Sequence, residues 1–101
     1  MPFSGNTGIP DPSDPNKTVP GTLCAWTVKA GTIAAPEQRL GTVEVAGRQY
    51  SVVICFRALI DKLYATEGST VPADDFILQW IADGDEIPYG RTHFRLESSD
   101  A

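Results

Sequence analysis

The prolines of this chain are concentrated at its start, and they restrict what the first 21 residues can form. Five of the eight prolines lie at positions 2, 10, 12, 15 and 20. Proline has no backbone N–H and blocks both helices and central strands, and the run from Pro10 to Pro15 favours extended, polyproline-like chain. Few apolar side chains, among them Phe3 and Ile9, interrupt this segment. We therefore expect residues 1–21 to be an extended or disordered N-terminal arm and residues 22–101 to be a single domain.

The residues after the arm show the alternation that β-strands require. In residues 22–30, Cys24, Trp26 and Val28 recur at every second position, so one face of this stretch is apolar. This period is typical of a half-buried strand, and we expect the three side chains to point into the core.

A hairpin is expected next. Residues 42–46 and 49–54 are rich in β-branched side chains and flank the dipeptide Gly47-Arg48. This arrangement predicts two antiparallel strands joined by a tight turn. A helix beginning near Ser51 is the alternative for the second half of this segment.

The spacing then changes to that of helices. One apolar stripe predicts a helix over residues 56–67, which ends at Gly68; its members are Phe56, Leu59, Ile60, Leu63 and Tyr64. A second helix is expected from Ser69 or Thr70 to Gly84, because Pro72 and two aspartates stand where helices begin. Its stripe consists of Phe76, Ile77, Trp80 and Ile81.

Alternation returns after Pro88 and predicts a last strand. One face of this strand carries Thr92, Phe94 and Leu96, and the other carries Arg91, His93 and Arg95. Strand, hairpin, two helices and a closing strand together predict an α+β fold, in which a small antiparallel sheet is covered on one face by both helices.

The charge of the chain is unevenly distributed. Residues 61–101 carry nine acidic and three basic side chains, a net charge of −6, whereas residues 1–60 have a net charge of +1. Direct nucleic-acid binding depends on clustered lysines and arginines, which the sequence lacks. There is also no apolar run of the roughly 18 residues that cross a bilayer, and no signal-peptide pattern at the start. We expect no contact with nucleic acid or membrane, and a location in the cytoplasm or in a particle assembled inside the cell.

No pattern in the sequence points to catalysis, a metal or a cofactor. Cys24 and Cys55 are far apart and His93 is the only histidine, and these residues do not make a zinc site on their own. In an intracellular setting we expect both thiols to be reduced and buried. A nucleophilic Cys55 with His93 as its base lacks a local signature, and no glycine-rich phosphate loop follows a strand. We expect a non-enzymatic protein.

Two charged groups are candidates for contact with a partner. Asp83, Asp85 and Glu86 surround a glycine, but their spacing does not match a calcium-binding loop, and we interpret them as a solvated acidic turn. The basic face of the last strand is its Arg91, His93 and Arg95. This face is either ordinary solvated surface or a contact for a carboxylate-rich partner.

The two tryptophans are expected to lie in the core. Trp26 and Trp80 each belong to an apolar stripe, which is where large aromatic side chains are usually buried. A partly exposed tryptophan would instead be a natural hot spot of a binding face.

Two functions fit these features. The first is a non-enzymatic assembly or adaptor subunit of the virion-associated or complex-associated kind. Its arm docks on another protein or on a second copy, with Phe3 and Ile9 in pockets. The alternative is an acidic inhibitor, of phage or immunity type, whose C-terminal half masks a basic nucleic-acid-binding surface of its target. The arm favours the first function and the charge asymmetry favours the second.

Overall fold

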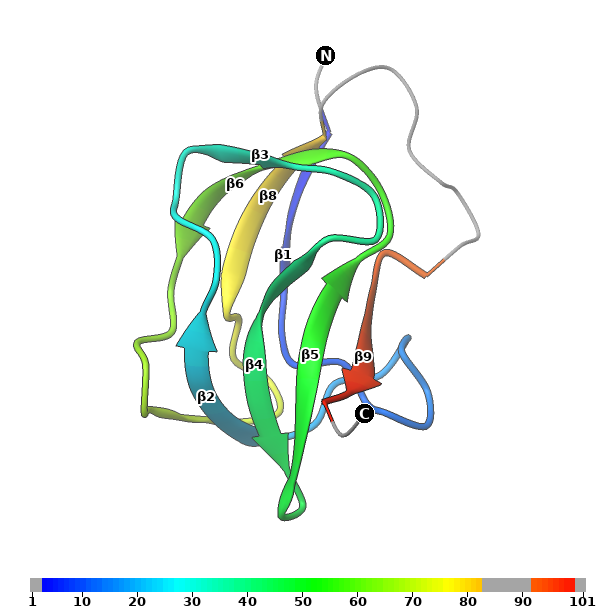
Figure 1. Ribbon diagram of the computed structural model, residues 1–101, viewed down its shortest axis with the longest axis vertical. Coiled ribbons are helices and arrows are strands. Elements are labelled where there is room, and N and C mark those ends of the chain that lie inside the picture. Colours follow the sequence, from blue (N-terminus) through cyan, green and yellow to red (C-terminus); the bar gives the residue numbers. More distant parts are fainter. Residues whose placement is uncertain (1–2, 83–91, 100–101) are drawn as a thin grey trace.

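The computed structural model describes residues 3–82 and 92–99 and shows two antiparallel sheets packed face to face (Figure 1). The four-stranded sheet has the order β1-β8-β6-β3, and the five-stranded sheet has the order β7-β2-β4-β5-β9. The strands are β1 (Ser4–Thr7), β2 (Gly21–Trp26), β3 (Thr32–Ala34), β4 (Arg39–Val45), β5 (Arg48–Ile54), β6 (Ala58–Leu63), β7 (Thr70–Val71), β8 (Leu78–Ala82) and β9 (Phe94–Ser98). The predicted α+β fold is wrong, because the described residues contain strands and no helix.

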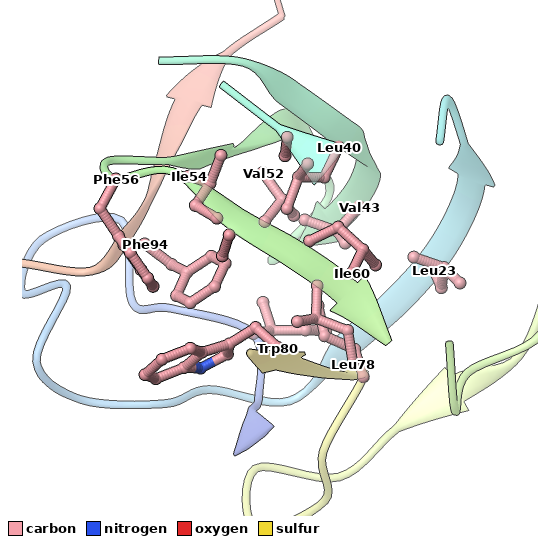
Figure 2. Packing of buried hydrophobic residues seen from close by; sticks show 14 of the residues in the cluster. Leu23, Leu40, Val43, Val52, Ile54, Phe56, Ile60, Leu78, Trp80 and Phe94 are labelled. Atoms are coloured by element: carbon pink, nitrogen blue, oxygen red, sulfur yellow. The ribbon is translucent and has the colours of Figure 1, made fainter. Parts of the chain in front are cut away.

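The core lies between the two sheets (Figure 2). Removing apolar surface from water is the main favourable contribution to folding, and both sheets supply inward side chains for it. The cluster includes Leu40, Val43, Val52 and Ile54 from the five-stranded sheet and Ala58, Ile60, Leu78 and Trp80 from the four-stranded sheet.

The predicted helix over residues 56–67 is wrong, because this segment contains β6. Ala58 and Ile60 are buried, and a β-bulge after Ile60 places one extra residue in the strand. Ile60 is opposite Trp80 and Leu63 is opposite Leu78, so both face the core although they are three positions apart. A bulge thus converts the two-residue period of a strand into a local spacing of three, which resembles one turn of a helix.

The predicted helix from residue 69 or 70 to Gly84 is wrong over its described part. Leu78 and Trp80 point into the core at the two-residue period of β8. The N–H of Asp75 donates to the carbonyl of Pro72 at 3.1 Å. Proline and aspartate are common in turns for the same reasons that they are common at helix starts, and here they make a turn.

The predicted hairpin is confirmed as β4 and β5. Val45 is opposite Arg48, so the turn is Ala46-Gly47, one position earlier than expected. Both turn residues have positive φ, 51° and 78°, as a type I′ turn requires. Ala46 takes a conformation normally left to glycine or asparagine, which shows that strand pairing imposes the turn on the sequence.

The strand predicted over residues 22–30 exists as β2, but its inward face differs in part from the expected one. Leu23 is fully buried, whereas Cys24, Trp26 and Val28 are half-buried. A bulge directly after Leu23 shifts the register with β4. The simple alternation of the sequence therefore does not continue through the strand.

The predicted last strand is confirmed as β9, which pairs with β5 at the edge of its sheet. Phe94 is buried and Leu96 is partly buried against the core. The face that carries Phe94 and Leu96 is therefore the one that packs against the core.

The segment from residue 3 to residue 21 packs against the rest of the chain. β1 pairs antiparallel with β8 along its whole length. Ile9 is fully buried in the core, and its carbonyl accepts a hydrogen bond from the N–H of Val19 at 2.9 Å. The proline-rich stretch between them folds back on itself through turns, and Pro10 forms an antiparallel bridge with Thr18. The isoleucine of this segment belongs to the domain's own core.

Substitution of Ile9 tests how much this segment contributes to stability. We expect Ile9→Ala to lower the free energy of unfolding by about 2–5 kcal/mol, because it leaves a cavity in the core. The matched control is Ile33→Ala, since Ile33 is 51% exposed and its truncation should change stability by no more than about 0.5 kcal/mol. Urea denaturation of both variants measures the difference, and equal midpoints for Ile9→Ala and wild type would contradict the burial of Ile9.

Candidate functional site

A surface hollow of about 310 Å³ lies where the edge of one sheet faces the edge of the other. β1, the start of β9 and the segment around Asn16 all contribute residues to its lining. We call it the aromatic hollow. Its lining residues are Asn6, Thr7, Gly8, Pro15, Asn16, Thr18, Phe76, Trp80, His93 and Phe94.

The Trp80 ring is the floor of this hollow, and it belongs to a group of packed aromatic rings in the core. The ring centroids of Phe56 and Trp80 are 4.9 Å apart at 81°, and those of Trp80 and His93 are 5.8 Å apart at 76°. Such edge-to-face contacts are favourable for aromatic pairs. Phe94 joins the same group, as Figure 2 shows, at 5.9 Å from Phe56. The predicted burial of Trp80 is confirmed, with 7% of the residue exposed.

Gly5 brings the N-terminal strand close to this floor. A Cβ atom at position 5 would lie 2.7 Å from Cζ2 of Trp80, which is too close for two carbon atoms. β1 can therefore cross the indole ring only with glycine at this position. The absence of a side chain at Gly5 lets β1 lie directly against Trp80.

Among the described residues, the aromatic hollow has a polar rim without full charges. Its described lining residues include no Asp, Glu, Lys or Arg, and His93 is the one ionisable side chain among them. Asn6, Asn16 and Thr18 supply neutral hydrogen-bonding groups. A concave apolar floor with a few polar groups is the usual form of a binding site, and this one suits an uncharged ligand.

A second hollow of about 240 Å³ adjoins the first, and Phe76 lines both. We call it the side hollow; its lining residues are Tyr64, Ala65, Thr66, Ser69, Thr70, Val71, Asp75 and Phe76. Phe76 is 52% exposed and Tyr64 is 46% exposed. The Tyr64 hydroxyl donates to Oδ1 of Asn6 at 3.1 Å, which links the two hollows. We call the two hollows together the Phe76 surface.

The exposure of Phe76 follows from where β8 begins to pair. The N–H of Ile77 donates to the carbonyl of Thr7 at 2.7 Å, and Ile77 is fully buried. Phe76 itself stands in the turn-rich segment before β8 and is 52% exposed, so its side chain points outward. The sequence pattern placed Phe76 on a helix stripe facing the core, and that placement is wrong.

The residues expected to bind a partner lie in different places. Phe3 is 44% exposed just before β1, whereas Ile9 is fully buried and offers no side chain to a partner. His93 is half-buried, with its ring packed on Phe56 and Trp80. Four others lie outside the described residues: Asp83, Asp85, Glu86 and Arg91.

Arg95 interacts with carboxylates of its own chain. Its Nη1 donates to Oε2 of Glu37 at 2.7 Å, and its Nη2 donates to Oε2 of Glu97. Nη1 also contacts the Sγ of Cys55 at 3.3 Å. The guanidinium of Arg95 is therefore bonded to two carboxylates of its own chain.

The Glu37–Arg95 pair changes the pKa of both groups. The pKa of the Glu37 carboxyl is lowered, chiefly because Arg95 donates a hydrogen bond to the charged form. The pKa of the Arg95 guanidinium is raised, first by its bond to Glu37 and then by its contact with Cys55. A carboxyl whose pKa is depressed by folding contributes stability above its unfolded pKa, and the contribution is lost as pH falls through the folded pKa.

This pair gives a direct titration test. We expect Arg95→Gln to move the pKa of Glu37 upward, towards the ordinary value of a glutamate, because the hydrogen bond to the carboxylate is lost. Carboxyl carbon chemical shifts, followed by NMR as pH is lowered, measure this pKa. Arg48→Gln, at the opposite end of β5, is the control and should leave the Glu37 titration unchanged. The same Glu37 pKa in the Arg95→Gln variant and in wild type would contradict the pair.

Both cysteines are free and half-buried, so the expected full burial is wrong. The backbone N–H of Cys55 donates to the carbonyl of His93 at 2.9 Å. The side chains of Cys55 and His93 do not share a partner: the thiol contacts Arg95, and the imidazole packs on Phe56 and Trp80.

Within the described residues, no group of three or more His, Cys, Asp and Glu side chains is placed to hold a metal ion. No helix in that part of the chain is long and apolar enough to span a membrane. Comparisons with protein-family models, curated proteins and solved structures find no match to this chain.

Proposed function

We propose that this chain is a non-enzymatic protein–protein interaction subunit, an assembly or adaptor protein that binds another protein or a second copy of itself through the Phe76 surface. The observation that carries this proposal is Phe76, an aromatic side chain 52% exposed between two adjoining hollows. Large aromatic residues beside pockets are frequent hot spots of interfaces.

The surroundings of Phe76 support a binding role. Tyr64, also half exposed, stands at the side hollow, and its hydroxyl is held by Asn6. Rigid aromatic side chains with a polar end contribute contact area at low conformational cost. The N-terminal segment contributes a wall of the aromatic hollow through Asn6, Thr7 and Gly8. Its role in docking is therefore to shape the site, since Ile9 belongs to the core.

Truncation of Phe76 tests this proposal. We expect Phe76→Ala to weaken partner binding about tenfold or more, as loss of a hot spot does. Ile33→Ala is the matched control, because Ile33 is 51% exposed on β3 and lines neither hollow. Affinity capture from the native host with quantitative mass spectrometry compares the variants, and sedimentation velocity measures self-association.

Thermal melting of both variants accompanies this comparison, because a folded Phe76→Ala protein is required for the binding result. Proteins captured equally by wild type, Phe76→Ala and Ile33→Ala would show that binding does not use the Phe76 surface. Loss of binding in both variants would show that the effect is not specific to the Phe76 surface.

The acidic-inhibitor function is the second candidate, and one observation favours it. Asp74 and Asp75 are exposed immediately before Phe76, and Glu67 is exposed in the preceding loop. Asp75 lines the side hollow. A basic target could therefore meet carboxylates beside the aromatic residue.

Salt dependence separates these two functions. Capture of a basic target through exposed carboxylates weakens as salt screens the charges, and neutralising them mainly slows association. For docking on the uncharged aromatic hollow we expect association and affinity to change little between low and high salt. Surface plasmon resonance with Asp74→Asn and Asp75→Asn measures this, with Glu44→Gln on the five-stranded sheet as control. A steep loss of association rate in the aspartate variants alone would favour the inhibitor.

A further inference from the structure

We propose that the partner contributes an extended segment that pairs as a strand with the free edge of β1 and places one uncharged apolar side chain in the aromatic hollow. This inference rests on the proposed function and specifies how the partner binds. It is carried by three observations: the orientation of the β1 backbone, the place of the hollow between two sheet edges, and the charge of its lining.

The backbone of β1 has groups that its own sheet does not use. The Phe3 carbonyl accepts from Ala82 and the Thr7 carbonyl accepts from Ile77, so the odd-numbered residues of this strand face β8. Successive residues of an antiparallel strand direct their N–H and C=O groups to opposite sides. Ser4 and Asn6 therefore direct theirs to the open edge, where β1 has no strand partner among the described residues.

A second strand that lines the hollow, β9, is also at the edge of its sheet. The Cys55 N–H donates to the His93 carbonyl and the Ser99 N–H donates to the Gln49 carbonyl, which fixes the odd-numbered residues of β9 as those that face β5. Phe94 and Leu96 accordingly direct backbone groups away from β5. Within the described residues, the aromatic hollow lies between these two edges, with Trp80 at its floor.

Exposed strand edges pair readily with an added strand, and many partners bind in this way, with main-chain bonds for affinity and pockets for alternate side chains. Every second side chain of a strand added to β1 would point to the face of Gly5 and Thr7. Thr7 lines the aromatic hollow, so a side chain on that face enters it. A volume of about 310 Å³ is at the low end of the roughly 300–1,000 Å³ of ligand pockets, which suits one large side chain.

The charge of the hollow's described lining limits which residues the partner's extended segment can carry. The described residues that line the aromatic hollow include no Asp, Glu, Lys or Arg, and a charged side chain placed against them would lose hydration without gaining an ionic partner. Asn6, Asn16 and Thr18 at the rim offer neutral donors and acceptors. The segment is therefore uncharged where it crosses the hollow, and cationic residues that meet Asp75 in the side hollow belong to its flank.

The probe for this proposal is a displayed library of random linear peptides, selected on the full-length protein. We expect enriched sequences with an uncharged centre that contains an apolar or aromatic residue at alternate positions. On binding of a selected peptide, the amide of Asn6 should become protected from hydrogen exchange in the wild-type protein. Enriched peptides with charged centres, or a library that yields no binder, would overturn the proposal.

A matched pair of variants at one position tests the strand pairing itself. Asn6→Pro removes the outward N–H, and edge strands tolerate proline at such positions. Asn6→Ala keeps this N–H and loses only the side chain. We expect the selected peptide to bind Asn6→Pro about tenfold or more weakly than Asn6→Ala, because proline also obstructs the approach of a strand.

The outcomes distinguish this inference from the proposed function. Equal binding by the proline and alanine variants, with loss of binding in Phe76→Ala, would overturn strand pairing and leave the Phe76 surface as the binding site. Binding unaffected by any of the three substitutions would overturn both. If Asn6→Pro does not fold, exchange protection of the wild-type Asn6 amide decides, and an amide that exchanges equally with and without peptide overturns the proposal.

Discussion

Packing around the Trp80 indole holds the strands of this domain in their arrangement. The ring meets Phe56 at its edge, lies beside His93, and is crossed by β1 at Gly5. One side chain thus connects the four-stranded sheet, the connection after β5 and the residue that precedes β9. The same ring is the floor of the aromatic hollow. Substitution of Trp80 would therefore affect both stability and the proposed binding. Phe76 is exposed, so its substitution tests binding with little effect on the core.

Local sequence signals predicted the elements whose partners lie nearby in the chain. The β4–β5 hairpin and the alternating last strand could be inferred because turn residues and a two-residue period are local properties. β6 could not, since its bulge after Ile60 gives an apolar spacing that also fits a helix. The register with β8 decides between these alternatives, and register is a property of two segments that are distant in the sequence. The contribution of Ile9 to the core was underestimated for a related reason. One apolar side chain is enough to hold this segment on the domain, because β8 pairs with the backbone of β1.

The candidate site was predictable only in parts. The sequence correctly predicted that Trp80 is buried, but it could not show that the ring also forms the floor of a hollow. His93 was assigned to a basic strand face, yet it precedes β9 and turns towards Phe56 and Trp80. Arg95 remains in the strand, where two carboxylates from this chain engage it. The missing information is again long-range, because each contact joins segments that no local pattern relates.

The pairing of β1 with β8 has a consequence for how the domain is made. Ser4 is opposite Ile81. β1 can therefore pair with its sheet only after the residues of β8 have been synthesised. Contacts between such distant segments carry a large loop-closure cost and fold slowly. During synthesis, which proceeds from the N-terminus, Ile9 is without its core while the β4–β5 hairpin can already form. The edge that we propose as a docking site is therefore completed late, and only a finished domain presents it.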